Sequence, residues 1–262
     1  MEHLDDGHDD AEFVQSLARG LAVIKAFDSE HPARTLSDVA KATGVSRATA
    51  RRSLHTLVRL GYVRNDGTLF GLTPKVLELG HAYLGGLSLP QVAEPHLRDL
   101  MNDVRETASL SVLDGDHVVH VARVATTGVI TVAINVGARF PAYATAMGRV
   151  LLAGKDDADF DAYLARVELQ RLTDQTVADV DRLRAIVRAV RDSGFCVSDQ
   201  ELNPGLRALA APVRDRGGKV IAAANIAAST GSCSLQRLRD MLPRLQEGAA
   251  AIERDWHLVS GP

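Results

Sequence analysis

The feature that most constrains the fold of this chain is a glycine, Gly44, that separates two short amphipathic segments. The segments LSDVAKAT (36–43) and RATARRSLHTLVRL (47–60) both carry apolar residues at helical spacing. Thr35 and Ser46 stand where helix N-caps are needed, and a glycine readily adopts the left-handed backbone that ends a helix. Because Ala40 is small enough to let two helices approach, the pattern predicts a helix-turn-helix.

The flanking residues extend this motif to a winged helix-turn-helix. Apolar residues between positions 13 and 28 recur at helical spacing, which predicts a first helix that ends before the segment HPAR (31–34). After Gly61, two short apolar segments flank Asp66-Gly67, a dipeptide typical of tight hairpin turns. Three helices followed by a hairpin therefore form the predicted N-terminal domain, over residues 13–73.

Charge is distributed unevenly and points to a polyanionic partner. The first 12 residues hold six acidic residues, and we expect them to form a disordered acidic tail. Residues 13–75 hold ten lysines and arginines against four acidic residues. A basic winged helix-turn-helix in an acidic protein indicates DNA binding, because the start of its third helix enters the major groove. The predicted contacts there are Ser46, Arg47, Thr49, Arg51 and Arg52, with Arg19, Arg34 and Arg64 as candidates for phosphate contacts.

The remainder of the chain predicts an α+β domain. A helical segment over residues 74–87 is expected to link the domains, and helices then flank mostly antiparallel strands up to residue 257. Among these elements are a strand over residues 129–137 and a single last amphipathic helix over residues 235–256. The sequence has no apolar stretch of membrane-spanning length and no signal peptide, so a cytoplasmic protein is expected. Cys196 and Cys233 are interpreted as buried thiols, and His117 and His120 fall on opposite faces of one strand, so no metal or cofactor is predicted.

No catalytic motif for nucleophilic, phosphate-binding or zinc chemistry appears in this second domain. Asp199 and Glu201 form a possible carboxylate pair, but no acid–base partner is evident. The sequence favours a non-enzymatic, ligand-sensing domain. Two alternatives stay open: an enzyme that uses Asp199 and Glu201 on a small acid, and an architectural DNA-binding protein without a ligand.

Several of these segments together resemble the IclR family of bacterial transcription regulators. They are FVQSLARGLAVIKAF, the helix-turn-helix around Gly44, INVGARFPAYATAMGRVLLAG and SDQELNPGLRALAAPV. The first and third segments are most similar to the branch that regulates aromatic acid catabolism, in response to β-ketoadipate, protocatechuate or 4-hydroxybenzoate. The resemblance implies a GAF-like effector-binding domain over residues 88–257, a homodimer or homotetramer, and a palindromic double-stranded DNA operator.

The resemblance also implies a pocket for a small organic acid at one side of the sheet. Its expected lining comprises Val132, Phe140, Ala146, Met147, Ser198, Asp199, Leu206, Ala208, Asn225 and Ala227, with Arg123 as a candidate cation for the acid. The start of a helix at Ala146 offers free N–H groups to a carboxylate. Met147 is equally explained as core filling, Asn225 as a partner of a neighbouring loop, and Arg123 as snorkelling to solvent or pairing with Asp or Glu.

Overall fold

The structure is a computed structural model that describes residues 13–28, 30–79, 89–126 and 135–260. The chain divides into two compact units, Met1–Gly86 and Leu87–Pro262. Each unit has its own hydrophobic core, and each is described below by itself.

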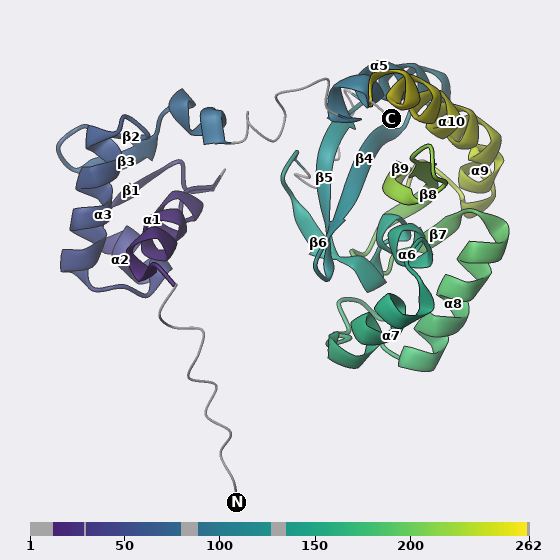
Figure 1. The fold of residues 1–262 in the computed structure, drawn as a ribbon, viewed down its shortest axis with the longest axis horizontal. Helices are drawn as coiled ribbons and strands as arrows, with labels where there is room; N and C mark the ends of the chain where they lie inside the picture. The colour runs from purple at the N-terminus through teal and green to yellow at the C-terminus, as the bar shows by residue number, and fades with distance from the viewer. Residues whose placement is uncertain (1–12, 29, 80–88, 127–134, 261–262) are drawn as a thin grey trace, which may run out of the picture. The chain divides into compact units, whose positions relative to one another are not determined.

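The first unit contains the three expected helices (Figure 1). They are α1 (Gln15–Lys25), α2 (Leu36–Thr43) and α3 (Arg47–Arg59). Their apolar stripes meet in a core formed by Val23, Val39 and Leu54, none of which has any exposed surface. The helix-turn-helix predicted around Gly44 is therefore confirmed.

Side-chain caps explain where α2 and α3 begin. Thr35 Oγ1 accepts a hydrogen bond from the Asp38 amide at 3.3 Å, and the Asp38 carboxylate accepts one from the Thr35 amide at 3.2 Å. This reciprocal arrangement satisfies two backbone donors that the helix leaves free. Ser46 caps α3 by accepting from the Thr49 amide at 3.2 Å, and Gly44 ends α2 with a φ of 66°.

A three-stranded sheet of order β1-β3-β2 completes the first unit. It comprises β1 (Ala33–Thr35), β2 (Val63–Asn65) and β3 (Leu69–Leu72). The Asp66 carboxylate accepts a hydrogen bond from the Leu69 amide at 2.9 Å, and Gly67 adopts a φ of 101° in the turn. The hairpin agrees with the prediction from the sequence. At HPAR (31–34) the sequence predicted only the end of the first helix, and the structure adds the strand β1 there.

The predicted linker helix begins differently from the expectation. Pro74–Leu77 form a 3₁₀ turn, which Thr73 caps by accepting from the Lys75 amide at 3.3 Å. Residues 80–88, which include most of the predicted linker, lie outside the described residues.

The second unit is built on a six-stranded antiparallel sheet of order β6-β5-β4-β9-β8-β7. The strands are β4 (Thr107–Asp114), β5 (His117–Val124), β6 (Arg139–Pro141), β7 (Cys196–Asp199), β8 (Leu206–Arg214) and β9 (Val220–Ser229). The strand that the sequence predicts over residues 129–137 falls largely outside the described residues, and β6 follows that segment.

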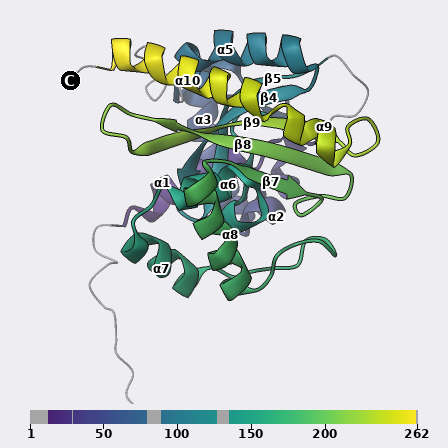
Figure 2. The ribbon, with the colours of Figure 1, turned by 90° about the vertical axis from the view of Figure 1, so that its right-hand side faces the viewer.

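Helices cover both faces of this sheet, as Figure 2 shows. One face packs against α5 (Leu89–Val104) and α10 (Leu242–Val259), and the other against α6 (Ala146–Ala153) with α8 (Val180–Ser193) beyond it. The helices α7 (Asp157–Arg166) and α9 (Leu235–Asp240) complete the unit. The single last helix predicted over 235–256 is wrong: it is divided at Met241, because Pro243 is tolerated only in the first turn of a new helix.

Helix α6 approaches the backbone that precedes it more closely than a side chain would allow. A Cβ atom at Gly148 would lie 2.1 Å from the carbonyl oxygen of Ala142. Thr145 caps the same turn by accepting from the Gly148 amide at 3.0 Å. Glycine at position 148 therefore sets how closely the first turn of α6 packs on residues 142–145.

We expect the substitution Gly148→Ala to lower the free energy of unfolding of the second unit by about 1–3 kcal/mol, because the backbone must move apart to admit the methyl group. Chemical denaturation of the full chain measures this effect. Gly20→Ala in α1 is the control, because nothing lies within 4 Å of its Cβ and alanine favours helix by about 1 kcal/mol. A Gly148→Ala variant as stable as the parent would contradict the packing argument.

Candidate functional site

A groove of about 440 Å³ lies between α2, α3 and the hairpin of the first unit. Arg47, Arg51 and His55 line it from α3, and Asn65 and Thr68 line it from the hairpin. The three α3 residues are spaced four apart, so they form one stripe along the helix. The groove thus brings cationic side chains of the helix beside polar residues of the wing.

The other predicted DNA contacts are distributed around this groove. Arg52 and Arg64 are exposed, whereas Arg19 and Arg34 are half-buried. Arg34 lies 3.9 Å from the Asp28 carboxylate, and its buried Nε has no hydrogen-bond partner among the described residues. Ser46 and Thr49 are engaged with each other in the cap of α3. His55 was not predicted, although its spacing from Arg47 and Arg51 was visible in the sequence.

The second unit has a small, partly open cavity of about 30 Å³ between the sheet and the start of α6. Most of its lining is small or apolar: Phe140, Ala144, Ala146, Met147, Leu202, Leu206, Ala208 and Ala227. The polar lining residues are His120, Thr145, Ser198 and Asn225. None of the described lining residues is Lys or Arg, so a ligand here meets a mostly apolar wall with a few hydrogen-bonding groups.

Most of the predicted effector residues come together at this cavity. Those that line it are Phe140, Ala146, Met147, Ser198, Leu206, Ala208, Asn225 and Ala227. Val132 lies outside the described residues. Residues that the sequence reasoning missed are His120, Ala144, Thr145 and Leu202.

Asp199 is not among the lining residues, because it follows Ser198 in β7 and successive residues of a strand face opposite sides of the sheet. Its carboxylate accepts a hydrogen bond from Arg207 Nε at 2.6 Å. Arg207 also donates to the Cys233 carbonyl at 2.8 Å, and Cys233 belongs to the core beneath α5 and α10. Asp199 therefore serves an ion pair on the face away from the cavity.

A row of buried polar side chains crosses the sheet beneath α6. Ser109 Oγ donates a hydrogen bond to the side-chain oxygen Oδ1 of Asn225 on the neighbouring strand. Ser111 lies opposite His120, with 3.3 Å between Ser111 Oγ and His120 Nδ1. All four of these side chains are at most 3% exposed. Such a row is unusual for a sheet core, where apolar residues are the norm.

A β-bulge places Arg123 on the same face as this row. The pairing of β4 with β5 shifts between Leu110 and Ser111, so that His120 lies opposite Ser111 and Arg123 lies opposite Ser109. Without the extra residue, His120 and Arg123 would face opposite sides, because they are three positions apart in the strand. Arg123 does not line the cavity and has no ion-pair partner within the described part of the chain.

The electrostatic environment of His120 favours the neutral ring. Burial lowers its pKa to about 4, and the nearby positive charge of Arg123 acts in the same direction. The ring lies edge-to-face with Phe140, with 5.7 Å between centroids. Its Nε2 is buried and has no hydrogen-bond partner among the described residues.

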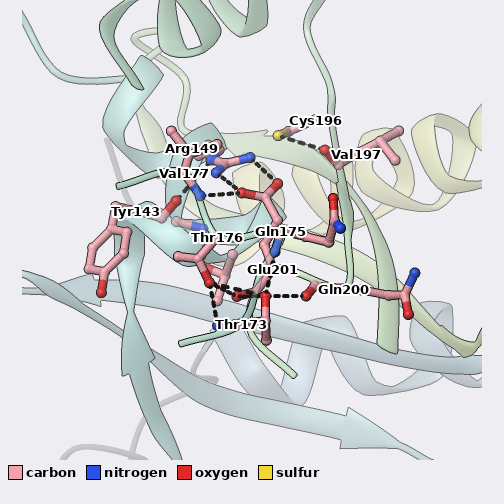
Figure 3. A network of polar contacts seen from close by, with 12 residues as sticks. Tyr143, Arg149, Thr173, Gln175, Thr176, Val177, Cys196, Val197, Gln200 and Glu201 are labelled. Atoms are coloured by element: carbon pink, nitrogen blue, oxygen red, sulfur yellow. Dashed lines mark hydrogen bonds and ion pairs between the residues drawn. The ribbon is translucent and has the colours of Figure 1, made fainter. Parts of the chain in front are cut away.

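A buried ion pair joins α6 to the connection between β7 and β8 (Figure 3). Arg149 is 1% exposed, and its guanidinium donates two hydrogen bonds to the Glu201 carboxylate, one of them at 2.6 Å. Its Nε donates to the Tyr143 carbonyl at 2.9 Å. The Thr176 hydroxyl donates to the Glu201 carbonyl at 2.7 Å, which ties a further loop to the same point. The network fixes α6 relative to residues 200–206, which carry two of the lining leucines.

These ion pairs bear on the possible carboxylate pair. Glu201 is committed to Arg149 and Asp199 to Arg207, so each carboxylate has an arginine partner.

The described residues contain no group of three or more His, Cys, Asp or Glu arranged to hold a metal ion. None of the described helices is long and apolar enough to cross a membrane.

We expect His120 to make the second unit less stable in acid. The unfolded chain binds a proton at this residue near its ordinary pKa of about 6.5, whereas the folded chain does so only near 4. Between these values the unfolded state binds more protons, so stability falls as pH falls. From pH 7 to pH 5, denaturation should show a loss about 2 kcal/mol larger for the parent chain than for His120→Gln. Equal losses in the two proteins would contradict the assignment.

Comparison with known proteins shows that both units match models of one protein family. The profile of the IclR helix-turn-helix domain matches residues 16–67, and that of the bacterial transcriptional regulator IclR C-terminal domain matches residues 81–254. The Pca regulon regulatory protein of Pseudomonas putida is 44% identical over 230 residues, which span 87% of this chain and 79% of that protein. The p-hydroxybenzoate hydroxylase transcriptional activator of Acinetobacter baylyi is 37% identical over 244 residues, spanning 91% and 90% of the two chains.

A solved structure shares the fold over nearly the whole length. It is an IclR homolog from Microbacterium hydrocarbonoxydans complexed with 4-hydroxybenzoate, with a TM-score of 0.83 and 26% identity. The match covers 93% of this chain and 99% of that one. Two domains in the same order, matched by profile, sequence and structure, establish the relationship.

Proposed function

Because the chain belongs to the IclR family of bacterial transcriptional regulators, we propose that its first unit binds operator DNA and its second binds a small organic acid that modulates this binding. The observation that carries the proposal is that the chain has two sites: a cationic groove on a winged helix-turn-helix and a mostly apolar cavity under α6. The acid acts as a signal, and it is released from the protein chemically unchanged.

The DNA-binding proposal is supported by the exposure and alignment of the α3 arginines. Arg47 and Arg51 are exposed, lie one turn apart and share a groove with the wing. Guanidinium groups suit both guanine edges and phosphates. Arg52 and Arg64 contribute further positive charge, and a homodimer or homotetramer would present such a head to each half of a palindromic operator.

The effector class is proposed from the lining of the cavity and from the relatives. Apolar walls suit a ring or a short carbon chain, and the N-terminal end of α6, which lines the cavity at Ala146 and Met147, favours an anion. Arg123, which lies on the cavity face of the sheet without a described partner, supplies the cation for a carboxylate. An aromatic acid or β-ketoadipate meets these requirements.

The size of the cavity implies that binding changes the protein. At about 30 Å³ it holds about two water molecules, whereas a benzene ring occupies a cavity of about 150 Å³. An aromatic acid therefore selects a more open arrangement of α6 and the sheet than the one described. A ligand that favours one of two arrangements provides the coupling that allostery needs, of about 1–3 kcal/mol.

Replacing both Arg47 and Arg51 with alanine should weaken operator binding at least tenfold, because each removes one contact to a base or phosphate. The operator is a DNA sequence selected by the parent protein from a random library, and binding is measured by fluorescence anisotropy at several salt concentrations. The dependence of the logarithm of affinity on that of salt should also become shallower, by about one unit for each lost phosphate contact.

The control is the double variant Arg182→Ala/Arg188→Ala, which removes the same charge from exposed positions of α8 in the second unit. It should bind the operator like the parent. If the Arg47/Arg51 variant folds and binds as tightly as this control, α3 does not contact DNA.

Filling the cavity tests the effector site separately. Ala227→Leu adds three carbon atoms at the lining and should weaken binding of the acid at least tenfold, since overpacking of about 1–3 kcal/mol opposes entry. Calorimetric titration measures the affinity, and NMR of the recovered acid shows whether it is unchanged. Ala165→Leu, at an exposed position of α7, is the control. Undiminished binding to Ala227→Leu would place the effector elsewhere.

A further inference from the structure

The two ring nitrogens of His120 have different surroundings, and the difference defines what the cavity recognises. Nδ1 lies 3.3 Å from Ser111 Oγ on the neighbouring strand. Nε2, at the tip of the ring, is buried without a partner among the described residues. His120 itself lines the cavity. A buried polar atom without a partner is rare in proteins and indicates that a ligand or water completes the site.

Ser111 determines which nitrogen carries the proton. Its hydroxyl lies 3.0 Å from the sulfur of Met147, and a thioether only accepts hydrogen bonds. The single hydroxyl hydrogen of Ser111 is therefore directed at Met147. The contact with His120 is then favourable only if Nδ1 carries a hydrogen and donates it to Ser111 Oγ. In the opposite tautomer, Ser111 would donate to Nδ1 and leave its oxygen lone pairs facing the sulfur.

This tautomer leaves Nε2 with a free lone pair. The ring stays neutral at physiological pH, since burial and Arg123 both oppose its protonation. A neutral acceptor attracts a hydroxyl donor and repels the lone pairs of a carboxylate oxygen. Around it, Phe140 packs against the ring and the remaining wall is mostly apolar, which favours a ligand that is flat and uncharged at this end.

We propose that His120 Nε2 accepts a hydrogen bond from a hydroxyl group of the effector, so that the cavity selects hydroxylated acids over acids of similar size without a hydroxyl. The proposal rests on the effector role of the cavity given above and narrows its ligand class to hydroxyaromatic acids. Met147 and Ser111 act as positioning residues, because they set the tautomer without contacting the hydroxyl.

Calorimetric titration of the full chain with four acids tests this selection: benzoate, 3-hydroxybenzoate, 4-hydroxybenzoate and β-ketoadipate. At least one hydroxybenzoate should bind about tenfold or more tightly than benzoate and β-ketoadipate, which matches the cost of leaving a buried acceptor unpaired. Titrations in buffers of different ionisation enthalpy should show no proton uptake, because the ring stays neutral.

A matched pair of variants tests the contribution of His120 Nε2. His120→Asn retains a polar group near Ser111 but has no atom at the Nε2 position, so it should bind benzoate and the hydroxybenzoates equally. His120→Gln reaches that position with an amide and should keep part of the preference. Circular dichroism melts establish that both variants are folded.

The outcomes separate two failures. If no acid binds the parent chain, the effector role itself is wrong. If acids bind but benzoate or β-ketoadipate binds as tightly as either hydroxybenzoate, or His120→Asn keeps the preference, only the hydroxyl assignment is overturned. Uptake of about one proton per acid would also overturn it, since a protonated His120 would then bind the carboxylate.

Discussion

Arg149 is almost completely buried, so the second unit must supply a partner for its charge wherever α6 packs. That partner is Glu201, a residue of the connection between β7 and β8, and the pair is closed by hydrogen bonds to the backbone around it (Figure 3). Removing one member of a buried pair costs about 3–5 kcal/mol, although the intact pair contributes little net stability. The main effect of the pair is therefore to hold the start of α6 against the loop that carries Leu202. The cavity lies between these two segments and the sheet.

The buried polar row on the sheet differs from the ion pair in its effect on stability. Ser109, Ser111, His120 and Asn225 replace apolar residues at central positions and stabilise the core less than apolar residues would. Ser109 pairs with Asn225, and Ser111 pairs with His120 Nδ1, which limits the cost of burial. The other ring nitrogen of His120, Nε2, has no partner among the described residues. A core that accepts this penalty beside a cavity is best understood as a binding surface, because a ligand offsets the penalty only when it is present.

Local signals made the first unit predictable from sequence, whereas the effector cavity depended on the family resemblance. The caps at Thr35 and Ser46 and the turn at Gly44 act within a few residues, so their roles could be read directly. The partner of Arg149 could not, because 52 residues separate it from Glu201 and only the fold joins them. The bulge opposite Ser111 was equally hidden, and it decides on which side of the sheet Arg123 lies. In the segment HVVHVAR (117–123), strict alternation placed His117 and His120 on opposite faces of the strand, but it gives no sign of the bulge that follows His120.

The two proposed sites place opposite demands on their side chains. Arginines on α3 act in water, where each contributes modestly and salt weakens it, so affinity for DNA depends on several of them together. Groups in the cavity act out of water, where a single unpaired acceptor discriminates between ligands by about tenfold. A small acid can change the affinity of the protein for DNA only if its binding also changes the conformation of the protein. The proposed effector site meets that condition, because a cavity of about 30 Å³ must widen to admit an aromatic acid.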